Sequence, residues 1–313
     1  MIQRVLISID VEAPLGQNGV EKLVYGRIGN ELFGIDRLMD LFDDKSVRGL
    51  FFVDICEAWE YGKDDVVDVL KHIASRGHDV GVHVHPDRMA DKKRRYLWQY
   101  SFEEQYEIIK KATDLYIEAL GKKPLSFRAG RYGADDNTLL VLKKLGYKID
   151  MSFFYGKKSC KISKFKGYNK LQMIDGVLEV PVTSFTSFKL FNYRKYEKTD
   201  CSLNHGEFKF FNKKLFGKVD VLSFFAHSFS LLKWRTRPDS PLFSKRMEKR
   251  FISNLSFLTK NDSYSFISER DILSLDIEEK EENEPNLSRG LRPFFYFLRT
   301  VFKVLINRIQ NNV

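Results

Sequence analysis

Three of the six histidines fall within eight consecutive positions, at His78, His83 and His85, and the carboxylate of Asp87 follows two residues later. Neutral imidazole and carboxylate oxygen are the ligands that borderline divalent metals such as Zn²⁺ prefer. Valines alternate with the last two histidines, which is strand spacing and places both imidazoles on one face. A proline then ends the strand. The segment therefore predicts a metal site at a strand end, with His78 in a structural role at the preceding turn.

Three other predicted strands also end in reactive groups. Asp10 and Glu12 close the first strand, Arg128 closes a short middle strand, and His227 closes a late one. In βα folds, catalytic groups gather at the carboxyl ends of the strands. We therefore expect these four residues to share one site with His83.

These residue types suit the hydrolysis of an amide or ester. A bound metal polarises a carbonyl and acidifies a water, and a free carboxylate takes the proton of that water. A guanidinium keeps the carboxylate ionised and oriented, while a second imidazole protonates the leaving group.

Strand and helix signals alternate along the chain. An apolar stripe at helical spacing predicts helices over 65–74, 101–120 and 136–145, and Asn204 to Gly206 reads as a polar loop. Ser101 opens the second helix with a capping box. The predicted strands are 5–9, 48–53, 79–85, 126–128, 148–150, 178–182 and 220–225. Repeated βα units predict an α/β fold with a parallel sheet, open or closed as a barrel.

Five segments resemble, in the same order, the motifs of NodB-type polysaccharide deacetylases, carbohydrate esterase family four. The likeness extends over roughly residues 3–270. It implies a distorted (β/α)7 barrel, a divalent metal that is most simply Zn²⁺, and removal of acetyl groups from sugars. The five segments are Ser8–Glu12, Gly49–Val53, Gly77–His83, Phe127–Gly130 and Phe225–Ser228.

Matched to these motifs, Asp10 resembles the catalytic base and Arg128 the arginine that orients it. His227 resembles the general acid, and His83 the first histidine ligand of the metal. The second carboxylate of the first motif is Glu12, spaced as Asp-x-Glu, which indicates a divergent subgroup and a carboxylate ligand from another strand.

Two departures from the family pattern affect the predicted site. The second histidine ligand usually lies four residues after the first, and Asp87 stands there. Either Asp87 replaces it, or His85 turns inward, or the metal site is weakened; we rank Asp87 slightly ahead of His85. Ala129 and Gly130 stand where two prolines are common. The sequence therefore does not decide whether the backbone of this motif contacts an oxyanion.

The composition is that of a globular protein, with 43% hydrophobic and 30% charged residues. The three cysteines have neither zinc spacing nor a disulfide framework. The net charge of +10 is diffuse and lacks a nucleic-acid pattern, and acidic glycans or an anionic membrane surface are equally good partners for it. The first strand begins at once and no 18-residue apolar span follows, so we expect a cytoplasmic protein.

The carboxyl-terminal part differs in character from the rest. We expect a barrel domain over 1–275, an acidic linker over 276–290 and a basic, phenylalanine-rich amphipathic helix over 291–313. That helix packs on the barrel, lies on the inner face of a membrane, or forms an oligomer contact.

The sequence therefore predicts a metal-dependent carbohydrate deacetylase that acts on an N-acetylated sugar of a glycan or glycolipid precursor. Two alternatives stay open. The same fold could hydrolyse a small non-sugar amide, or Asp87 at the ligand position could mark a metal-poor glycan-binding pseudoenzyme.

Overall fold

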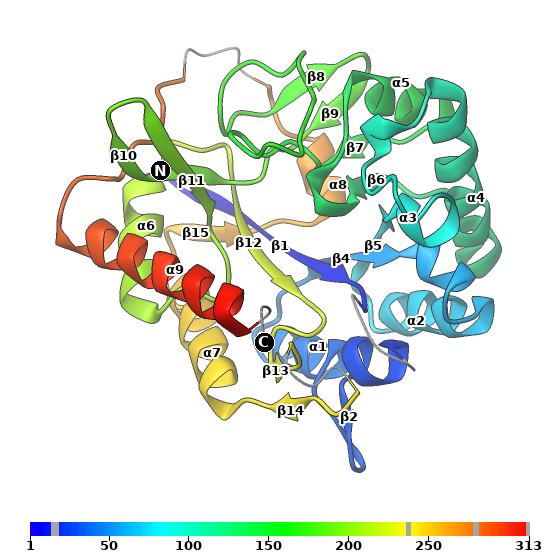
Figure 1. The fold of residues 1–313 in the computed structure, drawn as a ribbon, viewed down its shortest axis with the longest axis horizontal. Coiled ribbons are helices and arrows are strands. Elements are labelled where there is room, and N and C mark those ends of the chain that lie inside the picture. Colours follow the sequence, from blue (N-terminus) through cyan, green and yellow to red (C-terminus); the bar gives the residue numbers. More distant parts are fainter. Residues whose placement is uncertain (14–18, 236–238, 278–281, 311–313) are drawn as a thin grey trace.

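The computed structural model describes residues 1–13, 19–235, 239–277 and 282–310, with backbone alone for 303–310. Parallel strands run through the middle of the molecule and helices surround them (Figure 1). The main sheet contains β1 (Gln3–Val11), β4 (Gly49–Asp54), β5 (Asp79–Val84), β6 (Ser126–Ala129), β7 (Ile149–Asp150), β8 (Gln172–Ile174), β9 (Val177–Glu179), β12 (Val221–His227) and β15 (Tyr264–Phe266). The helices are α1 (Ile35–Asp43), α2 (Lys63–Ser75), α3 (Pro86–Met89), α4 (Phe102–Leu120), α5 (Asp136–Leu145), α6 (His205–Leu215), α7 (Lys245–Thr259), α8 (Glu269–Leu273) and α9 (Leu291–Gln310).

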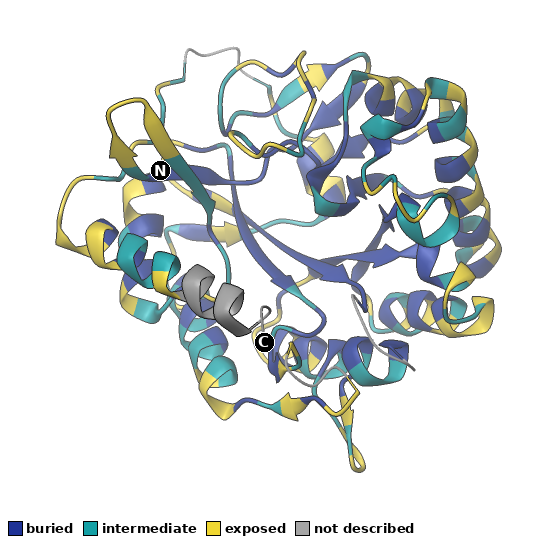
Figure 2. Cartoon of the chain, viewed as in Figure 1, coloured by how far each residue is buried: buried dark blue, intermediate teal, exposed yellow. Residues whose placement is uncertain are grey.

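Three small hairpins lie outside this sheet. They are β2 (Arg27–Ile28) with β3 (Glu31–Leu32), β10 (Ser184–Leu190) with β11 (Tyr193–Lys198), and β13 (Leu232–Lys233) with β14 (Leu242–Phe243). The strands of the main sheet are almost wholly buried apart from β8 and β15, whereas the β10–β11 tip and the start of α9 are exposed (Figure 2).

The strand order is β12-β1-β4-β5-β6-β7-β9-β8, and every pair except β8–β9 is parallel. Side-chain bonds bring the segment after β9 to β12 at the far end of this order. Thr183 Oγ1 donates to the Val221 carbonyl at 3.0 Å and accepts from the Ser223 N–H at 2.8 Å. This closes the sheet toward a barrel without a regular ladder, because a threonine hydroxyl can both donate and accept.

The helices predicted from apolar spacing correspond to α2, α4 and α5. Ser101 Oγ accepts from the Glu104 N–H, Glu104 bonds back to the Ser101 N–H, and Gly121 ends α4 in the left-handed region. The loop predicted at Asn204 to Gly206 is wrong. Asn204 instead caps α6, since its side chain accepts from the Glu207 N–H at 3.0 Å.

Helix α9 lies along α6 and the β10–β11 hairpin (Figure 1). Tyr296 is buried against Phe211, the ring of Phe297 stacks on Phe188 at 3.8 Å, and Arg299 pairs with Glu207 at 2.6 Å. One face of the helix therefore packs on the barrel. The helix predicted over 291–313 also contains Lys303, Leu305 and Ile309, whose side chains lie outside the described residues, as do residues 311–313.

Glu269, at the start of α8, is a buried carboxyl that ties the end of the barrel domain to β5 and β6. Ser126 Oγ donates to Glu269 at 2.8 Å, and the Glu269 N–H donates to Asp79 Oδ2 at 3.1 Å. Burial, and then the Asp79 carboxylate, raise the pKa of Glu269 to about 7.

We expect the Glu269→Gln variant to be more stable than the parent protein at pH 8, by up to roughly 3 kcal/mol, with little difference at pH 4.5. The folded pKa is raised, so the stability that this group contributes is complete below its ordinary pKa of 4.5 and is lost as the pH rises to about 7. Urea unfolding at both pH values measures the difference. Glu118→Gln, which removes the same charge at an exposed position, should not change the pH dependence; equal effects of the two variants would contradict the prediction.

Candidate metal-dependent hydrolase site

The register of the sheet brings the predicted strand ends together. Asp10 of β1 is opposite His227 of β12, and His83 of β5 is opposite Arg128 of β6. Ser228 fixes the end of β1, because its hydroxyl accepts from the Glu12 N–H at 3.3 Å and donates to the Glu12 carbonyl at 2.9 Å. The carboxyl ends of four strands therefore meet at one place.

Glu12, His83 and His85 offer ligand atoms that all lie within 4.8 Å of one another. His85 Nε2 lies 2.7 Å from Glu12 Oε2 and 3.1 Å from His83 Nε2, and His83 Nε2 lies 3.7 Å from Glu12 Oε2. Ligands of a tetrahedral zinc ion are about 3.3 Å apart, given bonds of about 2.0–2.1 Å. The three side chains therefore fit a divalent metal.

Hydrogen bonds support both histidines, one at the ring of His83 and one at the backbone of His85. His83 Nδ1 lies 2.8 Å from the Arg128 carbonyl, which fixes Nδ1 as the donor and leaves Nε2 as the free acceptor. Asp54 holds the backbone of His85, since its Oδ1 accepts from the His85 N–H at 3.3 Å, and Arg88 pairs with the other oxygen at 3.0 Å. A partner on the other ring nitrogen, as at His83, is typical of metal-binding imidazoles, whereas His85 Nδ1 has no such partner among the described residues.

Asp87 lies outside this cluster. Its carboxylate accepts two bonds from the Arg131 guanidinium, at 2.8 and 3.1 Å. The chain turns into α3 at Pro86, whereas the strand alternation continues as far as His85, whose backbone is extended. The geometry therefore reverses our ranking of the two residues and favours His85 over Asp87 as the third ligand.

Gly130 explains how His85 fits. A Cβ added at Gly130 would lie 2.7 Å from two atoms of the His85 ring. That is closer than non-bonded carbons approach each other, so a side chain there would displace the imidazole. The imidazole of His85 therefore occupies its position because a glycine, rather than the proline common in the family, stands at position 130.

Arg128 and Asp10 form a buried ion pair. The guanidinium is fully buried, donates to Asp10 Oδ1, and also donates to Ser8 Oγ at 3.0 Å. Burial raises the pKa of Asp10, but the charges of Arg128, His83 and His227 together outweigh it, so the pKa lies below its ordinary value. Asp10 is therefore ionised at neutral pH and can accept a proton.

His227 lies on the other side of Glu12, with its Nε2 3.6 Å from Glu12 Oε1. Its ring stacks on Phe229, and its backbone N–H donates to Ser230 Oγ at 2.8 Å. Burial lowers the pKa of His227, although Glu12 and Asp10 act in the opposite direction. The imidazole is therefore mostly neutral at pH 7.

Lys198 of β11 also reaches this region, and nothing in the sequence singled it out. Its Nζ donates to the Tyr132 hydroxyl at 2.7 Å and lies 3.1 Å from the centre of the Phe225 ring. Burial lowers the pKa of Lys198 to about 8. A lysine in an alternating polar strand is usually exposed, so the sequence offers no signal for it.

Part of the chain matches a known protein family. Residues 34–149 match the polysaccharide deacetylase family model. The match supports a NodB-type deacetylase and includes His83, His85 and Arg128, while Asp10, Glu12 and His227 lie outside the matched residues. A search of curated proteins found no significant match.

Solved structures of deacetylase type share the fold. A candidate polysaccharide deacetylase from Mycobacterium smegmatis is 16% identical, with a TM-score of 0.54 over 92% of this chain and 94% of that one. Another, from Pseudomonas aeruginosa PAO1, is 15% identical, with a TM-score of 0.53 over 87% and 89%. The allantoinase PuuE is 16% identical, with a TM-score of 0.51 over 87% and 89%. These likenesses confirm the expected α/β barrel of the (β/α)7 type.

Proposed function

We propose that this protein is a metal-dependent hydrolase that removes the acetyl group from an N-acetylated sugar of a glycan or glycolipid precursor. The observation that carries the proposal is the convergence of Glu12, His83 and His85 beside the Asp10–Arg128 pair. A three-ligand site leaves coordination positions open, as catalytic metal sites require. The family match supports the deacetylase chemistry.

Each residue has a role that its surroundings favour. A divalent metal, most simply Zn²⁺, held by Glu12, His83 and His85 would polarise the acetyl carbonyl and acidify a water. Arg128 occupies Oδ1 of Asp10, so Oδ2 is left to accept the proton.

His227 would give a proton to the departing sugar nitrogen. Since burial lowers its pKa, it must first gain that proton, and the neighbouring Glu12 carboxylate favours this gain.

Metal removal is the first test of this function. We expect the purified protein to contain about one divalent ion per chain and to release acetate from N-acetylated sugars. Chelation should abolish that release, and zinc or cobalt should restore it. Elemental analysis and an acetate assay measure both. A protein without bound metal, with no activity gained on adding either ion, would support the pseudoenzyme alternative instead.

Substrate preference distinguishes the small-amide alternative from the glycan deacetylase. PuuE, named as an allantoinase, has the same fold at 16% identity, so the fold alone does not choose between amides. Acetate release from sugars, with no hydrolysis of ureides or simple acetamides, would favour the glycan.

We further propose that the exposed face of α9 rests on the cytoplasmic surface of a membrane. No helix among the described residues is long and apolar enough to cross a bilayer. However, Phe294, Phe295 and Phe302 are each about half exposed or more, and Phe191 at the adjacent β10–β11 tip is 90% exposed. Basic side chains of this region, such as Arg292, would favour anionic lipids.

We expect the double variant Phe294→Ser, Phe295→Ser to bind vesicles of phosphatidylglycerol and phosphatidylcholine roughly tenfold or more weakly than the parent protein. Sedimentation with vesicles at two salt concentrations measures this. Met173→Ser, which removes an exposed apolar side chain far along the chain, is the control. Equal vesicle binding by the parent protein and both variants would contradict the membrane proposal and leave packing on the barrel as the role of α9.

A further inference from the structure

A cavity of about 800 Å³ adjoins the proposed metal site, and His227 is part of its wall. His227 Nε2 lies 3.6 Å from Glu12 Oε1, so a substrate held at the metal would extend into this space. The wall also contains apolar and aromatic surface, including Phe229 and Trp234, which suits the apolar face of a sugar ring.

The charge of this cavity is strongly one-sided. One acid, Asp200, lines it, together with five cationic side chains from the β12–β14 region, α7 and α9: Lys233, Arg235, Arg246, Arg250 and Arg299. Within the described parts of the chain, only Arg299 of these five forms an ion pair, with Glu207.

Arg250 lies at the centre of this arrangement. Its Nη1 donates to the Ser202 carbonyl at 2.8 Å, and no carboxylate of the described residues pairs with it. Burial, followed by the charges of Arg299 and Arg246, lowers its pKa. Arg246 and Arg250 have no ion-pair partner among the described residues, and like charges that approach each other cost free energy, so their convergence favours an anion between them.

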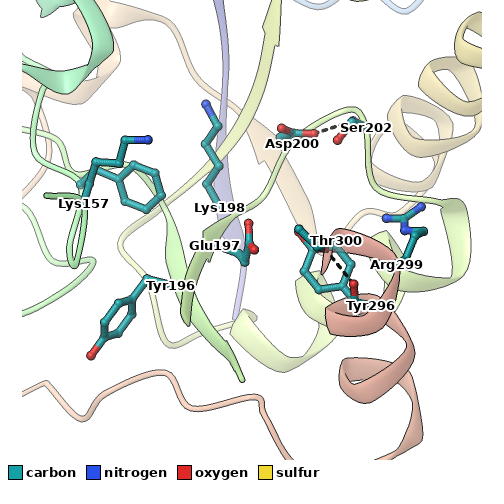
Figure 3. Close-up of a pocket in the computed structure, with 10 residues that line it drawn as sticks. Lys157, Tyr196, Glu197, Lys198, Asp200, Ser202, Tyr296, Arg299 and Thr300 are labelled. Carbon is teal, nitrogen blue, oxygen red and sulfur yellow. Dashed lines mark hydrogen bonds between the residues drawn. The ribbon is translucent and has the colours of Figure 1, made fainter. Parts of the chain in front are cut away.

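A second, smaller cavity of about 280 Å³ continues from the first. The two share Asp200, Ser202 and Arg299, and the smaller one adds Lys157, Lys198 and one acid, Glu197, which pairs with Lys195 (Figure 3). Cationic side chains therefore line both cavities.

We propose that the cavity lined by Arg246 and Arg250 binds an anionic group, a phosphate or a carboxylate, carried by the glycan whose acetyl group occupies the metal site. The inference rests on the proposed function and narrows its substrate to acidic N-acetylated sugars. Guanidinium groups bind both anions through paired N–H donors.

The test compares sugars that differ only in the anion, with the full-length, metal-loaded protein. We expect kcat/KM for N-acetylglucosamine 1-phosphate to exceed that for methyl N-acetylglucosaminide by tenfold or more, mainly through KM. Arg250→Gln and Arg246→Gln should each remove most of this preference, measured as the ratio of kcat/KM for the charged sugar to kcat/KM for the neutral one. N-acetylglucosaminuronic acid tests the carboxylate. Its kcat/KM relative to that of the neutral sugar, compared with the same ratio for the phosphate, identifies the preferred anion.

Lys249→Gln is the matched control, because Lys249 is exposed on the same helix and does not line the cavity. Arg246 is itself exposed, so its replacement should leave the fold intact even if Arg250→Gln does not. Equal kcat/KM for charged and neutral sugars, or an Arg246→Gln variant that keeps the preference, would overturn the inference.

Binding of inorganic phosphate, followed by calorimetry, separates this inference from the proposed function. We expect phosphate binding that both arginine variants weaken by tenfold or more. If phosphate binds in this way but no sugar releases acetate, the deacetylase proposal fails and the anion site stands. Phosphate binding that all variants share would mean an adventitious ion only and would contradict the anion site.

Discussion

The Asp10→Asn variant should lose turnover by a factor of about 10³ or more while it still binds its metal ion. Asparagine keeps the shape of the side chain but cannot accept the proton of an attacking water, and loss of a general base costs roughly 10² to 10⁴ in rate. The three proposed ligands are untouched, so metal content measured on the same preparation should match the parent protein.

The ion pair with Arg128 adds a second consequence. Because the guanidinium is fully buried, removal of the Asp10 charge leaves it without its partner and should lower stability. The thermal unfolding of Asp10→Asn is therefore measured as well, to verify that the variant is folded at the temperature of the activity assay. Asp220→Asn, which breaks the Asp220–Lys170 pair at the opposite end of β12, is the control. Activity that persists in folded Asp10→Asn would mean that another group is the base.

The His85→Ala variant should weaken metal binding by a hundredfold or more, whereas Asp87→Ala should change it little. Even supporting residues around a metal cost about 10- to 100-fold when they are lost, and a ligand should cost at least as much. The contrast follows from the geometry, because His85 Nε2 lies 2.7 Å from Glu12 whereas Asp87 is held by Arg131. Competition with a chromogenic chelator measures the affinity. A larger loss in Asp87→Ala would restore Asp87 as the ligand.

Gly130→Ala tests the same arrangement without touching a ligand. The added Cβ would lie 2.7 Å from the His85 ring, so we expect the imidazole to move and metal affinity to fall. Gly206→Ala, where a Cβ meets nothing closer than 3.5 Å, is the control. Unchanged affinity in Gly130→Ala would argue that His85 is not a ligand.

Local sequence determined the parts of the fold that depend on near neighbours. Ser101 begins α4 and Gly121 ends it, through hydrogen bonds that span four residues or fewer. The apolar stripes of α2 and α5 depend on helical spacing alone. The alternation that puts His83 and His85 on one face is equally local. Asn204 was missed although its capping box is local too, because a histidine and a glycine follow it.

The order of five motifs also predicted which strand ends meet, since parallel strands align their carboxyl ends. It could not decide the partner of each side chain. Arg131 is 44 residues from Asp87, and their pairing removes Asp87 from the metal cluster. Ser228, which holds Glu12, is 216 residues away from it.

The sequence by itself determined the fold class, the strand ends that form the site, and the residues that it makes available: Asp10, Glu12, His83, Arg128 and His227. Only the tertiary structure placed His85 rather than Asp87 beside Glu12 and His83, brought Lys198 beside Tyr132, and gathered five cations around one cavity. The physical reason is that side-chain identity and strand alternation are local properties. Which charges become neighbours depends instead on contacts between segments tens to hundreds of residues apart, which no local pattern records.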